Sequence, residues 1–292
     1  MFQTRRLFLL LPQFHHRRSM HVRPQNFWRT KEAQGACEKC VIHEADADKA
    51  PFYEVVPVTN DRATAVVAYL RNNYFQDDPI ARVVGLSKIN DTIEKVVLQK
   101  IEEGDGVLAV SSCPDRHILG VAIGSPFGPM ETDLTYRLAK VTEDKHLKNY
   151  MEYLSHMKYL HDISTSLATQ KIWDVCVLST DRGPRGIDVG KMLAKNILVL
   201  GKDHGFRFGR LDCINSLSTT IAKSLQLRLM WWLEFKDFSN YYHDAMYGVL
   251  CPHSGLSVFI TDLKSKKIKR FEREIFEFEG KQQLMKLRPK QK

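Results

Sequence analysis

A glycine- and arginine-rich turn between a predicted buried strand and a predicted helix constrains the fold of this chain more than any other segment. The strand is expected over residues 172–179, which are rich in β-branched and aromatic side chains. The helix is expected from Val189 to His204, where apolar residues recur at helical spacing until Gly205 ends the pattern. The order strand, turn, helix presents backbone N–H groups and the positive end of a helix dipole, which suit a phosphate group.

The turn itself, DRGPRGIDVGK, has residues that suit this interpretation. Gly183 and Gly186 let a ligand approach the backbone closely. Arg182, Arg185 and Lys191 supply positive charge. An ordinary solvated loop between a strand and a helix is the alternative. The turn matches neither the dinucleotide fingerprint GxGxxG nor the Walker sequence GxxxxGK[ST].

The rest of the chain alternates between strand and helix patterns. Further strands are expected over residues 53–59, 106–112, 117–124, 210–214, 231–236 and 257–263. Further helices are expected over residues 60–73, 91–103 and 218–226, with one or two more within 131–167. Pro79 disfavours helical geometry at Asp78, which predicts a bend that carries two adjacent carboxylates, Asp77 and Asp78. A chain of this length fits one α+β domain with tails.

Three motifs follow one another in an order known from one enzyme family. The segment RGIDVG matches motif A of that family, (Q/R)xxGx(G/A), at both ends, with Asp188 in place of the inner glycine. DDPI, beginning at Asp77, stands where the family has a D-E-P-L-like bend, and NSLSTTIAKSLQL, beginning at Asn215, stands where it has serines after the fifth strand. From about Tyr53 to Leu263 the chain thus resembles the GNAT N-acetyltransferases, and most closely their arylalkylamine (dopamine-type) branch.

The resemblance implies an α+β protein with the GNAT (acyl-CoA N-acyltransferase) fold, in which helices flank a mixed central sheet of about six to seven strands. It implies an N-acetyltransferase that moves the acetyl group of acetyl-CoA directly to a small primary amine, with an arylalkylamine as the expected acceptor. The residues expected to bind acetyl-CoA are Val177, Leu178, Ser179, Arg182, Gly183, Arg185, Gly186, Ile187, Asp188, Val189, Gly190, Lys191 and Asn215.

Transfer to an amine calls for a base, because an alkylammonium with a pKa of about 10.4 is almost fully protonated at pH 7. In the family a glutamate on the bend has this role. The resemblance assigns it here to Asp78, one methylene shorter, while an aspartate that only shapes the turn is the alternative. Backbone N–H groups around Val177 to Ser179 are expected to hold the thioester oxyanion. Ser218 or Ser216 is expected to protonate the leaving thiolate, and Ser218 is also placed to cap the following helix.

The acceptor pocket is expected beside the bend, where Tyr74 and Phe75 are aromatic and Asp77 is acidic. Aromatic side chains suit an arylalkylamine, whereas a pocket lined by carboxylates would also suit a polyamine, and the sequence does not decide between them. Asp188 and Asp78 both depart from the pattern of the family. A GNAT domain that binds acyl-CoA or a partner without turnover is therefore a second hypothesis.

The net charge of +9 lies at the two ends of the chain. Residues 1–31 carry seven basic and no acidic side chains, and residues 264–292 carry eleven basic and four acidic ones, so each end contributes +7 and the body between them carries −5. An acidic body does not favour nucleic acid as a partner. We expect a monomer with a basic segment over 1–50, a GNAT domain over 51–263 and a basic C-terminal tail over 264–292, outside the packed core or as a short exposed helix.

The amino-terminal segment is rich in arginine, lacks acidic residues and interleaves its basic residues with apolar side chains, as mitochondrial transit peptides do. A basic tail of a cytoplasmic protein is the other interpretation, so the sequence leaves both compartments open. No apolar run is long enough to span a bilayer, and no membrane partner is expected. Cys37 and Cys40 form a CxxC with His43 nearby, but no second pair stands at a usable spacing, and no metal is expected.

Overall fold

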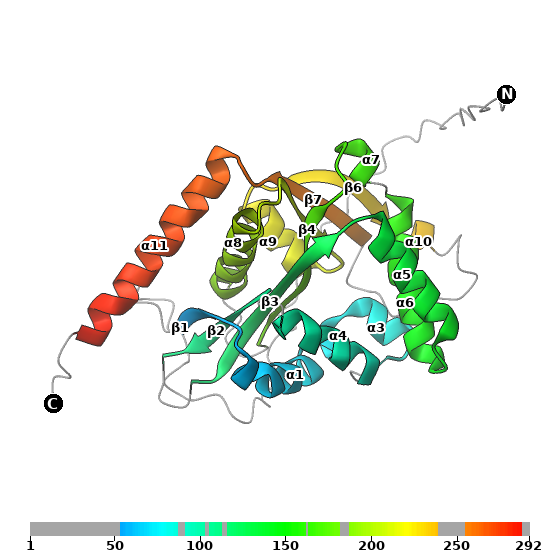
Figure 1. Cartoon of the computed structure of the whole chain (residues 1–292), viewed down its shortest axis with the longest axis horizontal. Coiled ribbons are helices and arrows are strands. Elements are labelled where there is room, and N and C mark those ends of the chain that lie inside the picture. Colours follow the sequence, from blue (N-terminus) through cyan, green and yellow to red (C-terminus); the bar gives the residue numbers. More distant parts are fainter. Residues whose placement is uncertain are drawn as a thin grey trace, which may run out of the picture. The chain divides into compact units, whose positions relative to one another are not determined.

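The computed structural model describes residues 53–86, 91–102, 105–112, 116–161, 163–181, 187–238 and 255–287. All of them lie within one unit, Ala36–Lys292. In this unit helices cover both faces of a central sheet (Figure 1). The α+β architecture expected from the sequence is confirmed.

Seven strands form the sheet in the part of the chain that the structure describes, in the order β1-β2-β3-β4-β5-β7-β6. Neighbouring strands are antiparallel except β4 and β5, which are parallel. The mixed sheet of about six to seven strands is therefore confirmed. The strands are β1 (Tyr53–Pro57), β2 (Gly106–Ser111), β3 (Ile118–Phe127), β4 (Ile172–Thr180), β5 (Phe208–Cys213), β6 (Arg228–Glu234) and β7 (Gly255–Asp262).

The helices are divided between the two faces of the sheet (Figure 1). They are η2 (Asn60–Arg62), α1 (Ala63–Asn72), α2 (Tyr74–Asp77), α3 (Pro79–Val83), α4 (Asp91–Glu102), α5 (Pro129–Val141), α6 (Lys145–Leu160), α7 (Ile163–Ser166), α8 (Ile187–Asp203), α9 (Ser216–Ser224), α10 (Phe235–Phe238) and α11 (Lys266–Leu287). Each face has its own apolar core. Leu108 and Val110 of β2 lie in the core with α1 and α6, whereas Val107 and Ala109 lie in the core with α8, because successive strand side chains point to opposite faces.

The carboxyl-terminal segment differs from the tail that the sequence analysis expected. It forms α11, a helix of 22 residues that packs against α8. Ile268 and Phe271 are fully buried in the core that includes α8, and Phe278 packs at its edge. These apolar residues are three and seven positions apart and therefore lie on one side of the helix. A segment that is highly charged overall thus still has a face that is buried in the core.

The strands β4 and β5 stay paired over only a short stretch. Trp173 pairs with Gly209 and Asp174 pairs with Arg210, and among the described residues the register contains no further pair between the two strands. Because β4 continues to Thr180, the strands diverge toward their carboxyl ends. The backbone of β4 beyond Asp174 therefore has one edge that β5 does not cover.

A bulge in β4 lies at the start of this diverging stretch. The register with β3 steps from Val175 to Val177, so Cys176 is the extra residue on the bulged strand. The Cys176 thiol donates to the carbonyl oxygen of Ile123 on β3 at 3.3 Å. Bulges bend a strand and redirect its side chains, and this one changes the direction of β4 where β5 parts from it.

A buried cluster of charges holds β4 and β5 together at the end where they are paired. Arg210 donates to both carboxylate oxygens of Asp212, at 2.7 and 2.8 Å, and its Nε lies 3.9 Å from Asp174. Lys158 of α6 pairs with Asp174 and, at 3.6 Å, with Asp212. Burial acts in the opposite sense, but Arg210 and Lys158 hold the pKa of Asp212 below its ordinary value. The cluster fixes the point from which the two strands diverge.

Candidate active site

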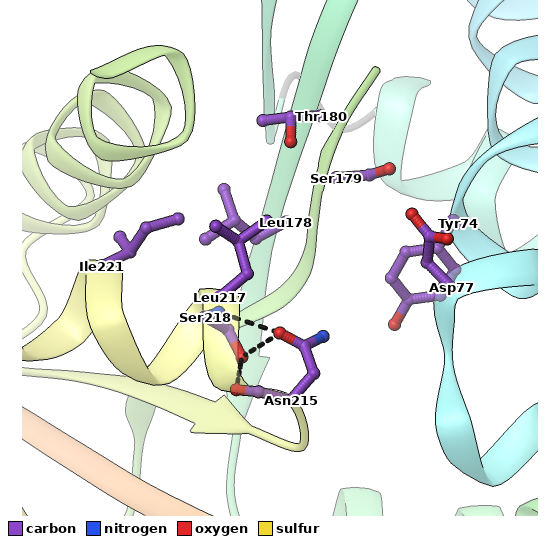
Figure 2. Close-up of a pocket in the computed structure, with 9 residues that line it drawn as sticks. All are labelled: Tyr74, Asp77, Leu178, Ser179, Thr180, Asn215, Leu217, Ser218 and Ile221. Atoms are coloured by element: carbon purple, nitrogen blue, oxygen red, sulfur yellow. Dashed lines mark hydrogen bonds between the residues drawn. The ribbon is translucent and has the colours of Figure 1, made fainter. Parts of the chain in front are cut away.

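A small cavity of about 50 Å³ lies beside the diverging end of β4. Figure 2 shows three elements around it, namely the last residues of β4, the first turn of α9 and the helix α2. The residues that line it are Tyr74, Asp77, Leu178, Ser179, Thr180, Asn215, Leu217, Ser218 and Ile221. Leu178, Ser179 and Asn215 were predicted for acetyl-CoA, and Tyr74 and Asp77 for the amine. The structure thus brings together residues predicted for the two substrates.

A larger cavity of about 270 Å³ lies on the face covered by α1, α4, α5 and α6. Its lining residues are Leu70, Tyr74, Phe75, Ile93, Val97, Ile123, Thr135, Leu138, Tyr150, Met151, Leu154, Cys176 and Val177. This set contains no acidic side chain and is mostly apolar. Of the predicted acceptor residues, Tyr74 and Phe75 line this cavity, whereas Asp77 lines the smaller one. Tyr74 lines both, so the two cavities meet at its side chain.

Asp78, the predicted base, is buried and lines neither cavity. It is the N-cap of α3, and its Oδ1 accepts the N–H groups of Ile80 at 2.8 Å and Ala81 at 3.1 Å. Its Oδ2 accepts the hydroxyl of Tyr150 at 2.7 Å. Burial raises the pKa of Asp78 above its ordinary value, and these hydrogen bonds oppose the rise. The residue does shape the turn before Pro79, and any exchange of protons with a substrate has to pass through a neighbouring group.

The start of α9 is capped by Asn215 and not by Ser218. The Asn215 Oδ1 accepts the N–H of Ser218 at 2.9 Å, and the Ser218 hydroxyl donates to the Asn215 carbonyl oxygen and Oδ1, both at 3.1 Å. The prediction that Ser218 caps the helix was wrong, because the helix begins two residues earlier, at Ser216. The Ser218 side chain lines the smaller cavity, whereas Ser216 is exposed and does not.

The turn before α8 lies mostly outside the described residues. This holds for Arg182, Gly183, Arg185 and Gly186, which were predicted to bind the pyrophosphate. The helix itself begins at Ile187, close to the expected position, and Lys191 lies half-buried one turn further on. Its first turn is thus in place to present backbone N–H groups at the end of the diverging β4.

The other residues predicted at the start of α8 divide into one exposed and two buried. The side chain of Asp188 is exposed, and its carbonyl oxygen accepts the hydroxyl of Tyr53 at 3.3 Å. Val189 is buried in the core. A Cβ on Gly190 would stand 2.7 Å from Cδ1 of Ile221, so the glycine allows α8 to approach α9 closely. Val189 and Gly190 therefore serve packing, whereas Asp188 faces solvent.

Tyr150, the hydrogen-bond partner of Asp78, was not predicted from the sequence as a site residue. Tyr150 recurs at helical spacing with Leu147 and Leu154, which is the pattern of a core position. The two residues are 72 positions apart, so no local signal joins them. One signal was available in the sequence: a tyrosine at a core position of a helix has a hydroxyl group that must find a hydrogen-bond partner when it is buried.

The predictions about a metal site and about a membrane-spanning segment can be compared with the described residues only. No group of three or more His, Cys, Asp or Glu side chains able to hold a metal ion occurs among the described residues. The CxxC formed by Cys37 and Cys40, with His43, lies outside them. None of the described helices is both long and apolar enough to cross a bilayer.

Neither a protein-family model nor a curated protein matches the sequence of this chain.

Comparison of the fold with solved structures does find similar chains. A mosquito arylalkylamine N-acetyltransferase like 5b superposes with a TM-score of 0.66 at 21% identity, covering 72% of this chain and 99% of that one. Arylalkylamine N-acetyltransferase 2 from Aedes aegypti has a TM-score of 0.66 at 19% identity, over 73% and 100%. A polyamine N-acetyltransferase from Drosophila melanogaster has a TM-score of 0.62 at 17% identity, over 72% and 99%. The chain therefore has the GNAT fold that its motifs predicted, shared with N-acetyltransferases of the arylalkylamine and polyamine types.

Proposed function

We propose that this protein is an N-acetyltransferase that transfers the acetyl group of acetyl-CoA to a small primary amine, and specifically to an arylalkylamine. The observation that carries the proposal is the meeting, at Tyr74, of the smaller cavity beside the diverging β4 and the larger apolar cavity. Acetyl transfer requires a thioester and an amine side by side, and two cavities with a shared wall suit that requirement. The fold shared with N-acetyltransferases supports the same reaction.

The smaller cavity suits the thioester end of acetyl-CoA. The edge of β4 from Leu178 to Thr180 is not covered by β5, so its backbone groups are available to an extended amide-containing ligand and to a thioester oxygen. The first turn of α8 lies at the end of the same strand, where its N–H groups and dipole favour the pyrophosphate. The hydroxyl of Ser218 reaches the cavity from the other side, where it can give a proton to the leaving thiolate.

The apolar cavity favours an arylalkylamine over a polyamine. An aromatic ring gains free energy when it leaves water for a pocket lined by Phe75, Leu138 and Met151. A polyamine would bring a second ammonium group into the same pocket, where the described lining residues include no carboxylate, and burying an unpaired charge costs several kcal/mol. Asp77 lines the smaller cavity, where it can attract the single ammonium group of the acceptor.

The reaction needs a neutral amine, and Asp78 is the proposed base. At pH 7 roughly one alkylamine in a few thousand is neutral, which corresponds to a cost of about 4 to 5 kcal/mol. Because burial raises the pKa of Asp78, its carboxylate is a better proton acceptor than an ordinary aspartate. The neutral nitrogen attacks the thioester carbon, and the oxyanion is held by N–H groups of β4. The C–S bond breaks as the thiolate leaves, and the proton that the new amide nitrogen loses passes by way of the Ser218 hydroxyl to that thiolate.

Thiol release in the presence of acetyl-CoA and a panel of amines tests this proposal. We expect turnover with phenethylamine-type amines and much slower turnover with polyamines. Silence across the whole panel at high enzyme concentration would contradict the activity, and a preference for polyamines would contradict the role of the apolar cavity.

A pair of variants on α5 tests the position of the acceptor. Leu138 lines the apolar cavity, whereas Leu134, one turn earlier, is exposed and does not line it. We expect Leu138→Trp to raise the KM for the arylalkylamine roughly tenfold, because the indole fills the cavity, while the Kd of acetyl-CoA stays unchanged. Leu134→Trp is the matched control and should change neither constant.

A further inference from the structure

We propose that the hydroxyl group of Tyr150 relays the proton of the acceptor amine to the buried carboxylate of Asp78. This inference rests on the proposed function and concerns how its base is reached. The need for a relay follows from geometry. Asp78 is 3% exposed and lines neither cavity, so an amine bound in either of them does not touch it.

Asp78 is connected to the cavities through Tyr150. Its Oδ1 is occupied by the backbone N–H groups of Ile80 and Ala81, as expected of a helix N-cap. Its Oδ2 accepts the Tyr150 hydroxyl at 2.7 Å, and Tyr150 lines the apolar cavity. The hydroxyl group of Tyr150 therefore connects the carboxylate of Asp78 to the apolar cavity.

Tyr150 shares the apolar cavity with Tyr74, which also lines the smaller cavity. The Tyr74 hydroxyl donates to the carbonyl oxygen of Cys176, at the bulge of β4, at 3.5 Å. Figure 2 shows the Tyr74 side chain opposite Asn215 and Ser218. An arylalkylamine whose ring occupies the apolar cavity thus shares that cavity with Tyr150.

The proton balance of the relay is simple. Tyr150 donates to Asp78, which leaves its oxygen to accept from the ammonium group. The N–H bond breaks as an O–H bond forms on Tyr150, and Tyr150 passes its own proton to Oδ2 of Asp78. The nitrogen keeps the electron pair, Asp78 becomes a neutral acid, and Tyr150 ends with one proton. The reverse path returns the proton to water.

The surroundings of Tyr150 keep its hydroxyl protonated. Burial, followed by the charge of Asp78, raises the pKa of this hydroxyl well above its ordinary value. Tyr150 is therefore a carrier that does not accumulate as a phenolate, and Asp78 is the group of this chain that ends with the proton.

Substitution of the Tyr150 hydroxyl is the central test. We expect Tyr150→Phe to lower kcat/KM for an arylalkylamine by roughly 100-fold or more, with the Kd of acetyl-CoA unchanged, because the base is disconnected. Asp78→Asn should lower kcat/KM by a similar factor. The double variant should have a kcat/KM no lower than that of the slower single variant, because Tyr150 and Asp78 act on the same proton in sequence. Tyr153→Phe is the matched control, because it removes a buried hydroxyl from the same helix and leaves the relay intact.

A second acceptor separates proton transfer from packing. An analogue of the same arylalkylamine with fluorine atoms next to the amine has a much lower amine pKa and is largely neutral at the pH of the assay. With this acceptor the kcat/KM of Tyr150→Phe should lie within a few-fold of the wild-type value. The increase of kcat/KM with pH that comes from deprotonation of Asp78 should also disappear.

Three results would overturn the relay. Tyr150→Phe with wild-type kcat/KM for the ordinary amine would show that the hydroxyl carries no proton. An equal loss with both amines would show that Tyr150 acts through packing alone. Wild-type protein that releases no thiol with any amine would instead reject the proposed function, and the relay with it, so the two failures are distinguishable.

Discussion

At the scale of single residues, Asp78 combines two roles that the sequence presents as alternatives. It caps α3 through Oδ1 and binds Tyr150 through Oδ2, so every oxygen of its carboxylate has a partner. The bend itself was predictable, because Pro79 disfavours helical geometry at the preceding residue. The partner was not predictable, because Tyr150 belongs to a helix that only the tertiary fold brings to the bend.

The raised pKa of Asp78 has a consequence for stability. Its pKa in the unfolded chain is about 3.9, and burial raises it in the fold, so the fold favours the neutral acid. The stabilisation is complete below the unfolded pKa and is lost as the pH rises through the folded pKa. The amide introduced by Asp78→Asn cannot titrate but can still cap the helix.

We therefore expect the free energy of unfolding of wild type to fall relative to that of Asp78→Asn as the pH rises above about 4, by about 1.4 kcal/mol for each unit of the shift. Urea unfolding of both proteins at several pH values measures this difference. A difference that is the same at every pH would show that the pKa of Asp78 is not raised.

Asp188 is the second residue with a measurable effect. Its exposed carboxylate lies in the first turn of α8, where the pyrophosphate is proposed to bind, and like charges about 5 Å apart in water repel by roughly 0.8 kcal/mol. Asp188→Asn should therefore lower the Kd of CoA by roughly threefold to tenfold, as measured by calorimetry. Asp203→Asn, at the other end of α8, makes the same change in net charge and should leave the Kd as it is.

At the scale of elements, α11 shows how composition can hide a packed helix. The Lys-rich segment suggested a tail, yet Ile268, Phe271 and Phe278 form one apolar side that contacts the core with α8. The spacing of these residues was visible in the sequence, so this helix could have been predicted. The bulge at Cys176 and the divergence of β4 from β5 could not, because both depend on pairing between strands that are distant in sequence.

Two phenylalanines of α11 provide a matched test of this packing. Phe271 is fully buried, whereas Phe276, five residues further along, is 76% exposed. Phe271→Ala should lower the free energy of unfolding by about 3 to 5 kcal/mol, because it leaves a cavity in the core. Phe276→Ala should change it by less than about 0.5 kcal/mol. Chemical denaturation measures both values, and an equal loss of unfolding free energy in the two variants would contradict the packing of α11 described above.

At the scale of the whole molecule, the sheet separates two apolar cores and opens between β4 and β5. The core with α8 and α9 supports the proposed acetyl-CoA side, and the core with α1 to α6 contains the apolar cavity. The order of the motifs predicted this fold, because each motif follows a recognisable strand or bend. The substrate cavity could not be predicted in the same way, since helices from several segments form its wall.

Acetyl-CoA is proposed to bind where β4 diverges from β5. Calorimetric titration of the full chain with acetyl-CoA tests this binding site, because every reaction proposed above requires it. We expect saturable heat for one site per chain, competition by CoA, and the same stoichiometry for Tyr150→Phe and Asp78→Asn. A titration without heat, together with no thermal stabilisation by acetyl-CoA, would contradict the proposed site.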